Sequence, residues 1–164
     1  MSFDVLMRYS DRLSPSRDII AAHREKIARH ESAWLGKFGK PIGDQRITLL
    51  NGAVGRGEIV SLYLATKAPK GWTLSRGDVL AVAKELPPKD RRLVPSYYAT
   101  DDLERNVSVW FHLASLEDEP SSTLERLTVV RSGGTARYAL LNSMSGFFFV
   151  WDESGARARQ AGGL

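Results

Sequence analysis

The stretch Ser32-Ala33-Trp34-Leu35-Gly36-Lys37-Phe38-Gly39-Lys40 places a bulky indole between a helix-like segment and a glycine-lysine run. If Trp34 faces a cleft, its ring can act as a stacking surface for a planar ligand. A second aromatic cluster, Val94-Pro95-Ser96-Tyr97-Tyr98, can supply the opposite wall. We therefore interpret the chain outward from these two stretches, because the segments that flank them decide the fold.

The segment before Trp34 predicts a strand followed by a helix. Residues 3–7 begin with alternation and continue apolar, which is typical of a first strand entering a core. Ser14 suits a helix cap and Pro15 suits the first helical position, and one apolar face continues to about His30. We expect this helix to cover a sheet.

The segment after Trp34 predicts several strands with few regular helices between them. This order disfavours a doubly wound sheet. It predicts an α+β fold with an open β-barrel or a curled, mostly antiparallel sheet and flanking helices. The expected elements are a turn at 36–39, a short helix over 44–51, a strand over 58–66, a turn over 67–71, a short strand over 72–74, a break at 75–78, strands over 79–86 and 107–114, one or two helical turns over 122–127, and a hairpin-like pair over 136–141 and 146–151.

Length and composition predict a single domain over residues 1–152 with a flexible tail over 153–164. The 164 residues are 43% hydrophobic, enough for one sizeable core. The absence of cysteine fits a cytoplasmic protein, and we expect no membrane contact because no apolar run approaches membrane-spanning length. We expect no metal or cofactor, since His23 and His30 lack a third ligand placed by the sequence.

Basic residues concentrate in the middle of the chain. Residues 35–92 hold eleven Lys/Arg and five Asp/Glu, a balance of +6, whereas residues 93–130 hold two and seven, a balance of −5. A basic surface attracts anions, so the block can hold phosphates of a nucleic-acid backbone. The predicted phosphate-binding residues are Lys37, Lys40, Arg46, Lys89, Arg91 and Arg92.

The order of these elements resembles the YTH and EVE domains of the PUA-like superfamily over roughly residues 3–150. The resemblance rests on Trp34 after the first helix, on residues 59–64 and 77–83, and on Val109-Trp110-Phe111-His112-Leu113. It implies an aromatic cage that takes up a modified or extruded base, with Trp34 as one wall. Tyr97 or Tyr98 is the positional candidate for the second wall.

The functional hypothesis is a nucleic-acid-binding module that recognises one modified base in an aromatic pocket. Stacking is worth about 1–3 kcal/mol per base but does not tell bases apart, so polar groups must supply selectivity. Main-chain groups at Leu35 and the side chains of Ser96, Asn142 and Ser143 are the candidates. Whether the partner is DNA or RNA stays open.

Two alternatives belong to other functional classes. The first is a small amidohydrolase acting on a modified nucleoside, as the related ASCH domains imply. The sequence favours a binding module over an enzyme, because no serine lies in a nucleophile-elbow pattern and no general base can be assigned. The second alternative is a protein-interaction module that binds a partner through an exposed apolar patch.

Overall fold

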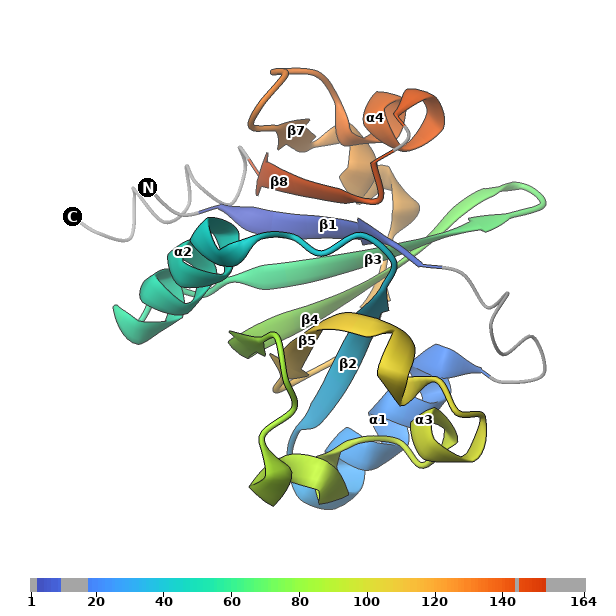
Figure 1. Cartoon of the computed structure of the whole chain (residues 1–164). Helices are drawn as coiled ribbons and strands as arrows, with labels where there is room; N and C mark the ends of the chain where they lie inside the picture. The colour runs from blue at the N-terminus through green and yellow to red at the C-terminus, as the bar shows by residue number, and fades with distance from the viewer. Residues whose placement is uncertain (1–2, 10–17, 144, 153–164) are drawn as a thin grey trace.

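An open, mixed β-sheet runs through the computed structural model, which describes residues 3–9, 18–143 and 145–152 (Figure 1). The strand order is β2-β5-β4-β3-β1-β8-β7, and β6 pairs with β4. Only the β1–β3 pair is parallel among these strands. The strands are β1 (Asp4–Arg8), β2 (Ala33–Phe38), β3 (Ser61–Ala68), β4 (Gly71–Ala83), β5 (Val107–Leu113), β6 (Glu117–Glu119), β7 (Leu127–Val129) and β8 (Phe147–Asp152).

Helices flank this sheet in several places. Figure 1 shows α1 and α3 at the lower end, α4 at the top beside β7, and α2 at the left, where it packs against β4. The α+β class and the mostly antiparallel sheet are therefore confirmed, while the described strands do not close into a barrel. None of the described helices is long and apolar enough to cross a membrane. The helices are α1 (Ile19–His30), α2 (Asp44–Gly55), α3 (Tyr97–Thr100) and α4 (Ala136–Asn142), with 3-10 turns η2 (Pro88–Leu93), η3 (Glu104–Asn106) and η4 (Ser121–Glu125).

The central strands are buried on both faces. In β3, Leu62 and Leu64 belong to one apolar cluster together with Leu50 of α2. Tyr63 lies between them in sequence and belongs to a second cluster, together with Leu140 of α4. Successive side chains of a strand point to opposite faces, so α2 and α4 cover opposite faces of the sheet.

Helix α2 is longer than the sequence predicts. The expected end at Asn51-Gly52 is wrong, because the helix continues to Gly55. The Asn51 side chain accepts a hydrogen bond from Val82 N and donates one to Val82 O, both at 2.8 Å. Asn51 therefore joins the helix to β4 instead of ending it.

Strand β4 is continuous through the segment predicted as a break. Ser75 and Arg76 pair with β3 on one side and with β6 on the other. Gly77 permits a close approach of another backbone segment, since a Cβ atom placed there would lie 2.4 Å from the Ser115 carbonyl oxygen. The glycine is thus a packing requirement within a strand and not a turn signal.

One of the two strands predicted near the carboxyl end of the chain is confirmed, and the other is not. The expected strand over 146–151 is confirmed as β8, and the strands expected over 3–7 and 107–114 are confirmed as β1 and β5. The expected strand over 136–141 is wrong, because these residues form α4. Thr135 caps this helix by accepting a hydrogen bond from Tyr138 N at 3.2 Å.

The start of the first helix differs from its sequence prediction as well. Asp18 caps α1 by accepting a hydrogen bond from Ala21 N at 3.0 Å. The predicted start at Ser14 and Pro15 lies outside the described residues, as does the predicted tail over 153–164.

We predict that Gly77→Ala destabilises the protein by about 1–3 kcal/mol, because the added methyl group must push the Ser115 backbone away. Urea unfolding measures the change. Gly55→Ala is the matched control, since nothing lies within 4 Å of a Cβ atom there, and it should not destabilise the protein. Equal stability of the two variants would contradict the close packing at Gly77.

Candidate functional site

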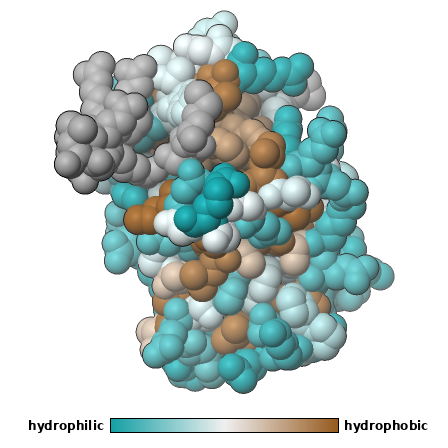
Figure 2. Space-filling model, turned by 90° about the vertical axis from the view of Figure 1, so that its left-hand side faces the viewer, coloured by the Kyte–Doolittle hydropathy of each residue, from teal (hydrophilic) through white to brown (hydrophobic). Residues whose placement is uncertain are grey.

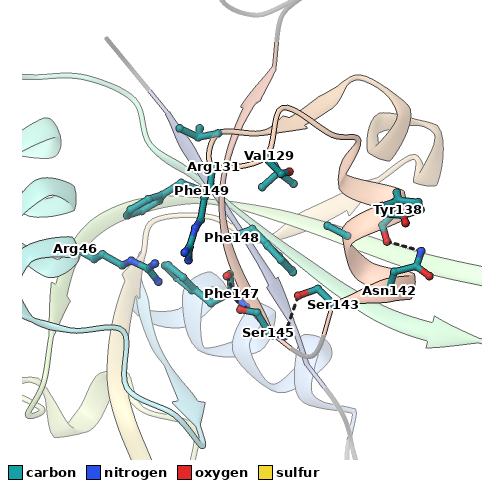
Figure 3. Close-up of a pocket in the computed structure, with 13 residues that line it drawn as sticks. Arg46, Val129, Arg131, Tyr138, Asn142, Ser143, Ser145, Phe147, Phe148 and Phe149 are labelled. Atoms are coloured by element: carbon teal, nitrogen blue, oxygen red, sulfur yellow. Dashed lines mark hydrogen bonds between the residues drawn. The ribbon is translucent and has the colours of Figure 1, made fainter.

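Strand β7 is too short to cover β8. β7 has three residues and pairs with residues 150–152 of β8, whereas β8 has six. Residues 147–149 therefore pair with β1 on one side and, among the described residues, with no strand on the other. A cavity of about 660 Å³ lies at this edge, and we call it the β8 edge pocket (Figure 3). It is lined by Arg46, Val129, Val130, Arg131, Ser132, Tyr138, Ala139, Asn142, Ser143, Ser145, Phe147, Phe148 and Phe149.

Strand alternation sorts the three phenylalanines of the β8 edge pocket between two sides. Phe147 and Phe149 belong to the cluster on the α2 face, and their rings meet edge to face with centroids 5.6 Å apart. Phe148 packs against the cluster on the α4 face. The pocket thus spans the strand edge and has aromatic rings on both sides of it.

Arginine side chains mark the α2 side of the pocket. The guanidinium carbon of Arg46 lies 5.8 Å from the ring centroid of Phe147 and 5.6 Å from that of Phe149, within cation–π range. Figure 3 shows the guanidinium groups of Arg46 and Arg131 on the same side as Phe147. Both arginines are exposed, and neither forms an ion pair within the described part of the chain.

Neutral hydrogen-bonding groups mark the α4 side. Asn142 donates through Nδ2 to the Tyr138 carbonyl oxygen at 3.0 Å, which holds the amide at the carboxyl end of α4. Ser143 follows it in the pocket lining, and its hydroxyl accepts a hydrogen bond from Ser145 N at 3.1 Å. Tyr138, which also lines the pocket, is 66% exposed. Figure 3 shows these residues opposite the arginines, with Phe148 between the two groups.

The charged residues in the described lining of the β8 edge pocket are all positive. Its described residues include two arginines and no aspartate, glutamate, histidine or lysine. A separate cavity beside α1 differs in charge, since Asp18, Asp118 and Glu119 line it together with Arg24. Figure 2, which faces the α2 side of the molecule, shows separate brown apolar patches among hydrophilic atoms. The β8 edge pocket therefore suits an anion that carries a planar or apolar part.

Metal binding finds no support within residues 3–9, 18–143 and 145–152. No three histidine, aspartate or glutamate side chains gather there closely enough to hold an ion.

The predicted aromatic walls lie at the other end of the sheet. Trp34, Tyr97 and Tyr98 share one apolar cluster and are 2%, 3% and 1% exposed. The indole of Trp34 stacks on the His112 ring with centroids 4.5 Å apart and planes 5° apart. Its Nε1 donates to Asp90 Oδ2 at 3.1 Å. A base can therefore stack on this face of Trp34 only if His112 moves away.

Buried polar contacts hold Tyr98 in place. His23 is fully buried, and its Nδ1–H donates to the Ile19 carbonyl oxygen at 2.7 Å. The remaining ring nitrogen, Nε2, accepts from the Tyr98 hydroxyl at 3.3 Å, while the hydroxyl oxygen accepts from Gly36 N at 2.8 Å. Nε2 accepts this bond when the imidazole is neutral. Burial lowers the pKa of His23 to about 4 and raises the pKa of Tyr98 to about 12.

The remaining pocket residues of the sequence prediction are divided between the two ends. Leu35 is buried at 3% exposure beside Trp34 in β2. Ser96 is exposed and lines a small cavity of about 230 Å³ together with Tyr98. Asn142 and Ser143 lie in the β8 edge pocket. The fold therefore does not assemble the predicted base-binding residues into one pocket.

The predicted phosphate-binding residues are dispersed too. Arg46 lines the β8 edge pocket, whereas Arg91 and Arg92 line the small cavity with Ser96. Arg91 also pairs with Glu104 at 3.1 Å. Lys37 donates to the carbonyl oxygens of Phe38 and Lys40, and burial lowers its pKa. Lys40 and Lys89 are exposed.

Sequence reasoning missed most of the β8 edge pocket. Phe147-Phe148-Phe149 carried a usable signal, because alternation along a strand prevents three consecutive rings from entering one core. Tyr138 and Arg131 carried none, since their place depends on α4 and on the turn after β7.

Comparison of the chain with family models, with curated proteins and with solved structures finds no match. The resemblance to YTH and EVE domains therefore stays a prediction based on the residues quoted for it.

We predict that acid destabilises the protein through His23. Its pKa is about 4 in the folded chain and 6.5 when unperturbed, so protons bind the unfolded state preferentially. The contribution is complete above pH 6.5 and is lost as the pH falls toward 4, by about 2 kcal/mol at about pH 5. Urea unfolding across this range should show a smaller loss for His23→Gln than for the wild type. His30→Gln is the control because His30 is exposed, and it should keep the wild-type pH dependence.

Proposed function

We propose that the protein is a nucleic-acid-binding module that recognises an unpaired or modified base in the β8 edge pocket. The observation that carries this proposal is the combination of three phenylalanines and a tyrosine with two arginines in a lining without carboxylates. Nucleic acid offers the complementary chemistry, since each nucleotide joins a planar ring to an anionic phosphate.

The exposed aromatic surface suits a base that has left its stack. Tyr138 is open at the rim, and Phe148 is half-buried behind it, so one ring can receive a base without unfolding of the core. Such stacking contributes about 1–3 kcal/mol per base and tolerates many sequences. The Asn142 amide and the Ser143 hydroxyl can then select among base edges.

A PUA-like relationship forms part of this proposal. The order of elements and the open sheet with flanking helices support it, whereas the base-binding role of Trp34 requires release of the indole from His112. The partner is DNA or RNA, and the two share the features that the β8 edge pocket can contact.

The two alternative functions have weaker support in the β8 edge pocket. A hydrolase needs a general base, and the described lining contains no carboxylate, histidine or lysine. A protein partner could add a strand at the β8 edge, but both backbone groups of Phe147 already bond to the Ser145 hydroxyl, at 3.0 and 3.3 Å.

We predict that Tyr138→Ala weakens binding of a fluorescent single-stranded oligonucleotide about tenfold, because one stacking surface is lost. Fluorescence anisotropy at low salt measures the affinity, with matched DNA and RNA strands that carry either an ordinary or a modified base. Leu141→Ala is the matched control: Leu141 is 59% exposed on the same helix but does not line the pocket. Absence of binding by every strand would refute the proposal.

The same assay separates the two ends of the sheet. If Tyr138→Ala binds as the wild type does and Trp34→Phe loses affinity while staying folded, the base site belongs to the Trp34 cluster. The opposite result assigns the base site to the β8 edge pocket.

A further inference from the structure

We propose that the β8 edge pocket binds a nucleotide in one orientation, with its phosphate on the α2 side and its base on the α4 side. This inference rests on the proposed function and deepens it, because it names the substrate class as a phosphate-bearing nucleotide unit of an unpaired strand. The orientation follows from the strand alternation that separates Phe147 and Phe149 from Phe148.

The α2 side is built to hold an anion. The Phe147 and Phe149 rings lie 5.8 and 5.6 Å from the guanidinium carbon of Arg46, which orders this cation on an apolar surface. Because no described carboxylate pairs with Arg46 or Arg131, their N–H groups are free to donate to phosphate oxygens. Two guanidinium groups on one side make that side the place of highest positive potential in the lining.

The α4 side is built to hold a neutral ring. Its polar groups, Asn142 and Ser143, are uncharged, and they lie beside the Phe148 and Tyr138 rings (Figure 3). An amide can pair with a base edge through a donor and an acceptor. In Asn142, Nδ2 already bonds to the Tyr138 carbonyl, whereas no hydrogen bond of Oδ1 occurs among the described residues. A base edge with an N–H donor is therefore the better match for this side.

The size and place of the pocket favour an unpaired nucleotide over a base pair. The cavity of about 660 Å³ lies between α2 and α4 at a strand edge, and helices flank it on both sides. A duplex keeps its bases stacked and paired, so it cannot present one base to Phe148 and one phosphate to Arg46 unless that nucleotide leaves the helix. Single strands meet this requirement without the cost of unpairing.

Competition experiments on the full chain test the orientation. A labelled single-stranded oligonucleotide is displaced by a nucleoside, by the corresponding nucleoside monophosphate, by an unlabelled trinucleotide or by a duplex. We expect the monophosphate to act at a concentration at least about tenfold below that of the nucleoside, because a charge-assisted contact to phosphate is worth one to two orders of magnitude. The trinucleotide should act at a lower concentration still, and the duplex should compete least.

Two kinds of variant should give opposite signatures. Arg46→Gln should abolish most of the preference for monophosphate over nucleoside and reduce the slope of log affinity against log salt by about 0.7. Asn142→Ala should weaken both competitors by a similar factor and leave their ratio unchanged. Arg29→Gln is the charge control, since Arg29 is exposed on α1 and pairs only with Glu25 among the described residues. Arg131→Gln provides a second test of the cationic side should Arg46→Gln fail to fold.

The inference and the proposed function fail in different ways. Binding of the oligonucleotide with equal displacement by nucleoside and monophosphate would overturn the orientation and leave the function standing. An unchanged preference for monophosphate over nucleoside in both Arg46→Gln and Arg131→Gln would also overturn the orientation and leave the function standing. A monophosphate that competes as well as the trinucleotide would assign the pocket to free nucleotides and overturn the single-strand part. No oligonucleotide binding at all would remove the function itself.

Discussion

The difference in length between β7 and β8 is the constraint on which the candidate site depends. An uncovered strand edge exposes backbone donors and acceptors that can pair with other chains. Here the Ser145 hydroxyl bonds to both backbone groups of Phe147, and Val130 N donates to the Phe149 carbonyl oxygen at 2.9 Å. Three backbone groups of the edge are therefore satisfied without another strand. The side chains of residues 147–149 still line the β8 edge pocket. A longer β7 would pair with these residues and leave no aromatic site there.

The aromatic groups at the two ends of the sheet differ in how far their ring faces and polar atoms are already engaged. At the lower end of the sheet, the Trp34 ring has His112 on one face and the Tyr98 hydroxyl is bonded to His23 and Gly36. These contacts fix α1, β2 and α3 relative to one another. At the upper end, Tyr138 is mostly exposed and Phe148 only half-buried. Rings whose faces and polar atoms are already engaged stabilise the fold, while rings with open faces can bind a ligand.

The sequence predicted the fold class well because strand patterning is local. Residues 107–114 alternate strongly and form β5, and the α+β class follows from the element order. The pattern failed at Gly77, where a tertiary contact to the Ser115 backbone decides, and at residues 136–141, where the local Thr135 cap begins α4. Predicting the β8 edge pocket would have required the pairing of β8 with β1 and the short length of β7, and both arise from contacts between distant parts of the chain.

Basic residues that are grouped in the sequence are likewise not grouped in the folded protein. The basic block over 35–92 does not form one basic surface, because Arg91 pairs with Glu104 of the acidic block and Lys37 bonds to nearby carbonyl oxygens. The β8 edge pocket is distinguished by its local net positive charge. Arg46 comes from the basic block and Arg131 from outside it, and the described lining holds no carboxylate that would neutralise them. At physiological salt, screening limits the reach of surface charge to about 8 Å. Two guanidinium groups that have no ion-pair partner among the described residues therefore act on a ligand at the site more strongly than a larger excess of charge elsewhere in the chain.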